Sequence, residues 1–167
     1  MHILKIFFIC FFISLKSYAE CSDQASNQVD WTNCNFVESL ELQGVSLSSS
    51  EMSGVNLALA NIEKSQINNA NMAFGNFIFT NFNNSNLFAS NMQYANCNNA
   101  IFDNSNLAKV NFEGANLFSA SFRGANLFQV NLKGANITSA IFEEANLSEV
   151  IWIDGRTCAL GSVGSCD

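Results

Sequence analysis

The sequence offers few side chains with which a protein could do chemistry. The only histidine is His2, so the rest of the chain contains no imidazole that could activate a nucleophile. Glu143 and Glu144 form a carboxylate pair, but no other polar motif in the sequence converges on them. The sequence contains no glycine-rich phosphate loop and no metal-ligand cluster. We therefore expect no catalytic residue, no cofactor and no metal, and we predict that the protein is not an enzyme.

Residues 1–19 are predicted to be a secretory signal peptide. A lysine near the start is followed by an apolar segment, Ile6–Leu15, which is too short to span a bilayer. Ser17 and Ala19 are the small residues that a signal peptidase site requires, so cleavage is expected before Glu20. We predict an exported protein, periplasmic or extracellular, without a membrane span after cleavage. A retained N-terminal anchor is the alternative.

A repeat of five residues organises the rest of the chain. Every fifth residue from Leu42 to Trp152 is apolar, and at 49% apolar composition such a run has a chance of about one in ten million. The position two residues earlier is small or β-branched except at Leu40, and the position between them is mostly asparagine. A period of five fits neither a regular helix nor a flat strand. It indicates short extended sides separated by corners, and such units bury their apolar residues only when copies stack as a solenoid.

The pattern A-(N/D)-(L/F)-x-x over residues 40–154 resembles the pentapeptide-repeat family. This resemblance implies an all-β fold, a right-handed quadrilateral β-helix in which four repeats make one coil, and here just under six coils. A coil of 20 residues would stack Phe82, Phe102 and Phe122 in one column, which supports four sides. Glycines at the last position of several units suit corners that need positive φ. The asparagines are expected to form ladders on the outside.

We expect both ends of this solenoid to be capped. The predicted organisation is a signal peptide (1–19), an N-terminal cap (20–39), the β-helix (40–154) and a C-terminal tail closed by a disulfide (155–167). The step from Phe36 to Leu42 is six residues, so one residue is inserted between the cap and the first coil.

The cysteine positions agree with export. Four of them flank the two end segments and predict two local disulfides, Cys21–Cys34 and Cys158–Cys166. A metal site is the alternative, but the spacings are not C-x-x-C and no histidine is close. Cys97 falls at an inward apolar position, where a buried and inert thiol is expected.

The expected surface is acidic. Without the leader the chain keeps five basic and fourteen acidic side chains, a net charge of −9, which disfavours a nucleic acid partner. With a 20-residue coil, exposed charges should form ladders of Asp103, Arg123 and Glu143 and of Glu113 and Lys133, each pair contributing about 0–1 kcal/mol.

Outward apolar residues indicate an interaction surface. The predicted surface would bind a protein partner or a second copy of the chain, and its residues are Phe74, Ile78, Phe79, Phe88, Tyr94, Phe118 and Phe128.

Two functions remain open. The first is an exported, non-enzymatic structural or protein-interaction module. The second is an acidic rod that mimics DNA and binds a topoisomerase, as the resembled family's cytoplasmic members do. The leader, the predicted disulfides and a charged fraction of only 13% disfavour the second. An ice-binding rod with asparagine ladders is a more distant third reading.

Overall fold

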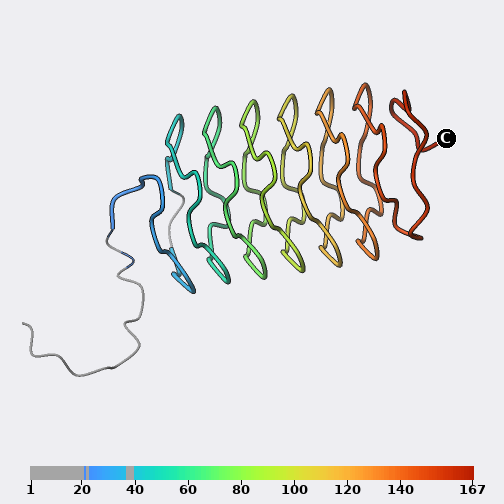
Figure 1. Ribbon diagram of the computed structural model, residues 1–167. Coiled ribbons are helices and arrows are strands. Elements are labelled where there is room, and N and C mark those ends of the chain that lie inside the picture. The colour runs from blue at the N-terminus through green and yellow to red at the C-terminus, as the bar shows by residue number, and fades with distance from the viewer. Residues whose placement is uncertain (1–20, 22, 37–39) are drawn as a thin grey trace, which may run out of the picture.

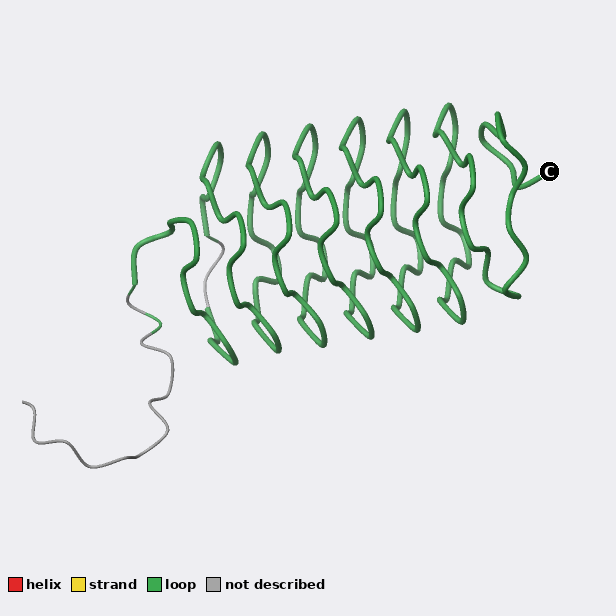
Figure 2. Cartoon of the chain, viewed as in Figure 1, coloured by secondary structure: helices red, strands yellow, loops and turns green. Residues whose placement is uncertain are grey.

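The computed structural model of the chain describes residue 21, residues 23–36 and residues 40–167. The predicted leader lies outside the described residues, as do residues 20, 22 and 37–39 of the predicted cap. The described part of the chain has no helix and no continuous strand, and its extended residues pair as isolated β-bridges, as the uniform colour in Figure 2 shows. No helix capable of crossing a membrane occurs among these residues.

Each five-residue unit makes one side and one corner of a coil. In the unit 40–44, Glu41 forms the bridge and Leu42 packs against the core. The corner is closed by a hydrogen bond from the Val45 N–H to the Leu42 carbonyl, at 3.4 Å. Gly44 has a φ of 72°, as the third residue of a type II turn requires. Every fifth residue from 44 to 149 likewise has positive φ, which confirms the predicted corners.

Four units complete one coil, because most bridges join residues 20 positions apart, from Glu41 and Asn61 to Asn131 and Ile151. The coils stack into a right-handed quadrilateral β-helix, as expected (Figure 1). Backbone hydrogen bonds join each side to the next coil; the Leu42 N–H donates to the Asn61 carbonyl at 2.7 Å, for example.

The four sides of the coil define four faces of the rod. Face A carries the bridge residues of the series that begins at Glu41, face B the series from Ser46, face C the series from Glu51 and face D the series from Asn56, each in steps of 20. In a four-sided coil, face A lies opposite face C, and face B lies opposite face D.

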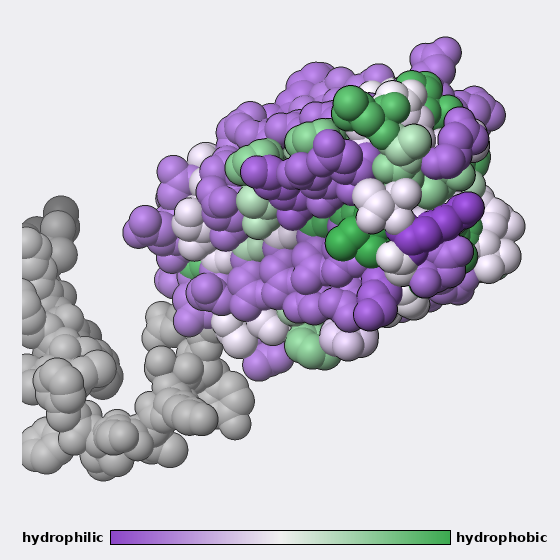
Figure 3. Space-filling model, turned by 45° about the vertical axis from the view of Figure 1, so that its right-hand side comes forward, coloured by the Kyte–Doolittle hydropathy of each residue, from purple (hydrophilic) through white to green (hydrophobic). Residues whose placement is uncertain are grey.

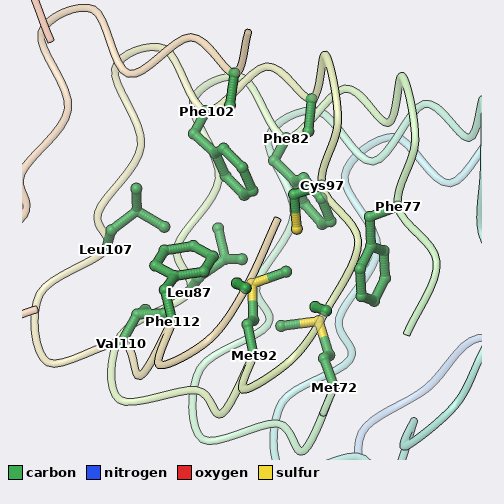
Figure 4. Close-up of a cluster of buried hydrophobic side chains, with 14 of the residues drawn as sticks. Met72, Phe77, Phe82, Leu87, Met92, Cys97, Phe102, Leu107, Val110 and Phe112 are labelled. Atoms are coloured by element: carbon green, nitrogen blue, oxygen red, sulfur yellow. The ribbon is translucent and has the colours of Figure 1, made fainter. Parts of the chain in front are cut away.

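Apolar side chains fill the inside of the rod. Each core residue at five-residue intervals from Leu47 to Leu132 is at most 1% exposed. On face A the rings of Phe82, Phe102 and Phe122 stack in register with centroids 5.0 and 5.1 Å apart, which confirms the predicted column. Figure 4 shows Phe82 and Phe102 in this column, with Cys97 nearby inside the core. The tight stacking keeps successive coils in register.

Asparagines at the bridge position form the predicted ladders on the outside. The Asn76 side-chain amide donates to Asn56 Oδ1 at 2.9 Å, and Asn126 donates to Asn106 at 3.2 Å. The Asn56 Oδ1 also accepts the Ala58 N–H at 3.2 Å. Each asparagine therefore links two coils and also fixes its own corner, which explains why this position is so often asparagine.

Ion pairs between coils are fewer than predicted. Arg123 pairs with Glu143, but Asp103 accepts a hydrogen bond from the Arg123 backbone N–H, at 2.9 Å, instead of pairing with its guanidinium. The expected pair of Glu113 with Lys133 does not form in the described part of the rod. The Glu113 carboxylate accepts a hydrogen bond from Gln93 in the preceding coil instead, at 3.2 Å.

The N-terminal segment pairs with the first coil. Its bridges join residues 21 positions apart, Asp30 with Glu51 and Asn35 with Asn56, which confirms the inserted residue. Trp31 is buried against the core.

The C-terminal tail turns back on the last coil and runs antiparallel to it. Asn146 pairs with Val163, and Ile151 pairs with Thr157. Figure 1 shows this tail in red, across the end of the stacked coils.

Candidate functional site

Two corners of the rod carry exposed aromatic side chains. Phe74 and Tyr94 lie one coil apart at the corner between faces C and D, and their rings stack with centroids 5.4 Å apart and planes 14° apart. Phe74 is 65% exposed and Tyr94 is 55% exposed. The Tyr94 ring extends over Gly114 of the next coil, where a Cβ would lie 2.5 Å from the ring. Because Gly114 has no Cβ, the Tyr94 ring can lie against its backbone on the surface.

The corner between faces D and A continues this surface. Phe79 is 56% exposed there, and Leu59 is 59% exposed one coil earlier. Ile78 is half-buried on face D between the two corners. We name Leu59, Phe74, Ile78, Phe79 and Tyr94 the aromatic stripe. Sequence reasoning missed Leu59, although its spacing of 20 residues from Phe79 could have identified it.

The structure does not gather all seven predicted residues into one surface. Phe118 is exposed on face D, two coils beyond Ile78. Phe88 and Phe128 are half-buried on face B, at the opposite side of the rod. The Lys109 ammonium lies 5.8 Å from the centroid of the Phe88 ring, so this ring already has an intramolecular contact.

The reactive side chains that the structure describes lie apart from one another. Cys97 is fully buried, and burial raises the pKa of its thiol far above the ordinary value, so the thiol stays protonated and unreactive. Glu143 and Glu144 are exposed at a corner, where Glu143 pairs with Arg123. Among the described residues, no three histidine, cysteine or acidic side chains are placed to hold a metal ion.

The four end cysteines lie in the predicted pairs. The Cα atoms of Cys21 and Cys34 are 5.4 Å apart, and those of Cys158 and Cys166 are 4.9 Å apart, both within the range of disulfides. Cys97 is a free cysteine.

These features define a β-solenoid protein with a filled core and an exposed aromatic stripe. The sequence model for pentapeptide repeats matches in eight copies, over residues 41–73, 80–117, 95–134 and 111–151. The chain belongs to the pentapeptide-repeat family.

Several solved structures are similar to the chain at low identity. HetL, a pentapeptide repeat protein involved in heterocyst differentiation regulation in the cyanobacterium Nostoc sp. strain PCC 7120, is 19% identical over 78% of this chain and 75% of HetL, with a TM-score of 0.35. A pentapeptide repeat protein of the Arabidopsis thaliana thylakoid lumen is 20% identical over 72% of this chain and 82% of its own, with a TM-score of 0.43.

QnrB1, a plasmid-mediated fluoroquinolone resistance protein, is 14% identical over 77% of this chain and 74% of its own, with a TM-score of 0.40. No curated protein sequence matches the chain significantly.

Proposed function

We propose that this protein is an exported, non-enzymatic interaction module that binds a protein partner through the aromatic stripe. The observation that carries the proposal is the exposure of Phe74, Phe79 and Tyr94 on one side of a rigid rod. Exposed aromatic side chains are enriched in protein interfaces, where they bury large areas at a small entropic cost. The filled core and the asparagine ladders hold the backbone that carries these rings. Little backbone entropy is therefore lost when a partner binds.

Export is supported by the predicted leader and by two cysteine pairs at disulfide distance, because disulfides persist in oxidising compartments. A non-enzymatic role is supported by the burial of Cys97 and by the separation of the remaining reactive side chains along the rod.

Substitution of the stripe tests the interaction. The doubly substituted chain Phe79→Asn/Tyr94→Asn should lose its partner in affinity capture from the envelope and extracellular fractions. Asparagine suits these corner positions, so the fold should be kept. Phe128→Asn on face B is the matched control and should capture the same proteins as the unchanged chain. Equal capture by the stripe variant and the control would show that the stripe is not the binding surface.

A further inference from the structure

Face D differs from the other three faces of the rod in its lack of charge. No acidic or basic residue occurs in its five described units, which are residues 55–59, 75–79, 95–99, 115–119 and 135–139. The units of every other face contain at least two charged residues; those of face B, for example, contain Lys109 and Glu149. Face D therefore suits a ligand that is itself uncharged.

The C-terminal half of face D presents a regular grid of outward side chains. Each of three successive coils contributes an asparagine at the bridge position, the residue two positions later and a corner residue. We name these nine residues the amide patch: Asn96, Asn98, Asn99, Asn116, Phe118, Ser119, Asn136, Thr138 and Ser139. Neighbouring coils are about 4.8 Å apart, so the amide patch extends about 10 Å along the rod.

Phe118 is the apolar residue of the amide patch and belongs to its middle coil. Its side chain is 39% exposed. Figure 3 shows hydrophobic side chains among hydrophilic ones on the side of the rod that it presents, so exposure alone does not mark a site. The exposed rings of Phe74 and Tyr94 stack on each other, whereas the Phe118 ring stacks on no other ring of the described chain. Its neighbours in the adjacent coils are the polar side chains of Asn98 and Thr138.

The asparagines of the amide patch keep free donors. Asn116 Nδ2 donates to Asn96 Oδ1 at 3.2 Å, and Asn136 Nδ2 donates to Asn116 Oδ1 at 3.1 Å. Each amide nitrogen carries two hydrogens, so one of them stays available to a ligand. The Asn116 and Asn136 oxygens also accept the N–H groups of Phe118 and Thr138, at 3.3 and 3.1 Å. The free donors are therefore held in place before a ligand binds, which lowers the entropic cost of binding.

Three hydroxyl groups add to these donors. The hydroxyls of Ser119, Thr138 and Ser139 have no hydrogen-bond partner among the described residues. An outward hydroxyl of face B is already engaged, by contrast, because Ser48 donates to Asn68 Oδ1 at 2.8 Å. The amide patch thus offers free amides on one side of an exposed ring and free hydroxyls on the other.

Carbohydrates present the groups that match this arrangement. The face of a pyranose ring carries C–H bonds, whose positive hydrogens are attracted to the negative face of an aromatic ring. The hydroxyls of the sugar lie around its edge and exchange hydrogen bonds with amides and hydroxyls. In a β-1,4-linked chain of glucose-type sugars these hydroxyls are equatorial, so every sugar presents an apolar face and a polar edge. A patch of this length spans two neighbouring sugars.

We propose that the amide patch binds an uncharged β-1,4-linked glycan. One sugar face lies on the Phe118 ring, and the hydroxyls of the glycan bond to the amides of Asn116 and Asn136 and to the Thr138 hydroxyl. A flat surface encloses little of its ligand, so we expect a Kd of about 0.1–1 mM for a short oligosaccharide. The amide patch shares no residue with the aromatic stripe, so the proposal does not rest on the partner binding proposed above.

An NMR titration tests the proposal on the isotope-labelled chain, expressed from its complete sequence and purified without reductant. The probes are the soluble tetrasaccharides of cellulose and of chitin, both of which are β-1,4-linked and uncharged. We expect the side-chain amide signals of Asn116 and Asn136 and the backbone signal of Phe118 to shift. Both probes share the ring faces and the linkage, whereas only the chitin probe carries acetamido groups. Stronger binding of the chitin probe would support the proposal and would identify an N-acetylated glycan as the ligand.

Two substitutions separate the ring from the polar groups. Phe118→Ala removes the stacking surface and should weaken binding about ten-fold. Thr138→Val removes one hydroxyl but keeps the shape of the side chain, and should weaken binding about three- to ten-fold. Phe128→Ala on face B is the matched control. This control and the stripe variant Phe79→Asn/Tyr94→Asn should both bind as the unchanged chain does.

The salt dependence supplies a readout that needs no variant. Binding should change little between about 0.05 and 0.5 M salt, because no charged group takes part. A lack of shifts with either probe up to about 10 mM would overturn the proposal, as would undiminished binding by Phe118→Ala. Glycan binding lost in the stripe variant would place the site on the stripe and would overturn it too. A captured protein lost in Phe118→Ala, without glycan binding by the unchanged chain, would assign the amide patch to a protein partner instead.

Discussion

The two inward positions of a unit share a limited volume in the core, so a larger side chain at one position goes with a smaller residue at the other. Phe77 is fully buried on face D, and the small position two residues before it is Gly75, where many units have alanine. A Cβ on residue 75 would lie 2.4 Å from the Phe77 ring. Glycine is therefore required at residue 75 for space, whereas at a corner such as Gly44, where a Cβ would meet nothing within 4 Å, it serves a positive φ.

This exchange predicts coupled effects on stability. Gly75→Ala should lower the free energy of unfolding by about 1–3 kcal/mol because the added methyl group meets the ring. Phe77→Leu should cost about 1 kcal/mol through the cavity it leaves. The double variant recreates the pair formed by Ala115 and Leu117, so it should be more stable than the sum of the single effects by about 1 kcal/mol or more. Urea denaturation of the four proteins measures this coupling, and strictly additive effects would contradict it.

Much of the residue-level pattern follows from the sequence, because one apolar position per five residues fixes which side chains point inward. The Phe82 column and the Asn56 ladder could both be predicted in this way. The role of Gly75 could not, since it depends on the rotamer of one neighbouring ring. The prediction of an ion pair between Glu113 and Lys133 was wrong, because Glu113 accepts a hydrogen bond from Gln93 in the preceding coil instead.

At the scale of the corner, all members of the aromatic stripe except Ile78 occupy positions that disfavour bulky side chains. Leu59, Phe74, Phe79 and Tyr94 have φ between 56° and 65°. This left-handed region costs a residue with a Cβ roughly 1–2 kcal/mol, and asparagine and glycine tolerate it best. Asn69, Asn84, Asn99 and several glycines occupy the same corner position elsewhere. The stripe therefore exists despite its conformational cost, which supports a role outside folding.

Phe79→Asn should therefore stabilise the rod. We expect the free energy of unfolding to rise by about 0.5–1 kcal/mol, because asparagine tolerates positive φ and the exposed ring contributes little packing. Asn84→Phe, the reverse change at the corner between faces A and B, is the matched control and should destabilise the rod by a similar amount. Thermal unfolding measures both changes. A lower melting temperature for Phe79→Asn would show that the ring is held by contacts within the rod.

The arrangement of the candidate site was only partly predictable at this scale. The five-residue period indicates which residues point outward, and the 20-residue coil indicates which ones share a column. Residues 10 positions apart lie on opposite faces of a four-sided coil, so Phe88 could not lie beside Ile78. Periodicity also does not show that the tail covers two faces and leaves two open, because the path of the tail departs from the repeat.

At the scale of the whole molecule, the rod is a one-dimensional stack in which each coil contacts only its neighbours. The middle coils are held on both sides, whereas each end has one neighbour and is the place where unravelling begins. The two cysteine pairs lie in the end segments, with sequence separations of 13 and 8 residues. By loop entropy each disulfide would contribute about 2.5–3 kcal/mol. The two cysteine pairs thus lie where stacking is weakest.

This distribution leads to a prediction about where the protein resides. Disulfides of this kind persist only in an oxidising compartment, so both should be present if the leader directs export. We expect the intact mass of the native protein, measured without reductant after cell fractionation, to be that of a chain beginning at Glu20 and lighter than the reduced chain by four hydrogens, about 4 Da. The protein should be recovered outside the cytosol. A full-length and fully reduced chain in the cytosol would contradict export, would remove the covalent links from both ends of the rod, and would make topoisomerase binding the first function to test.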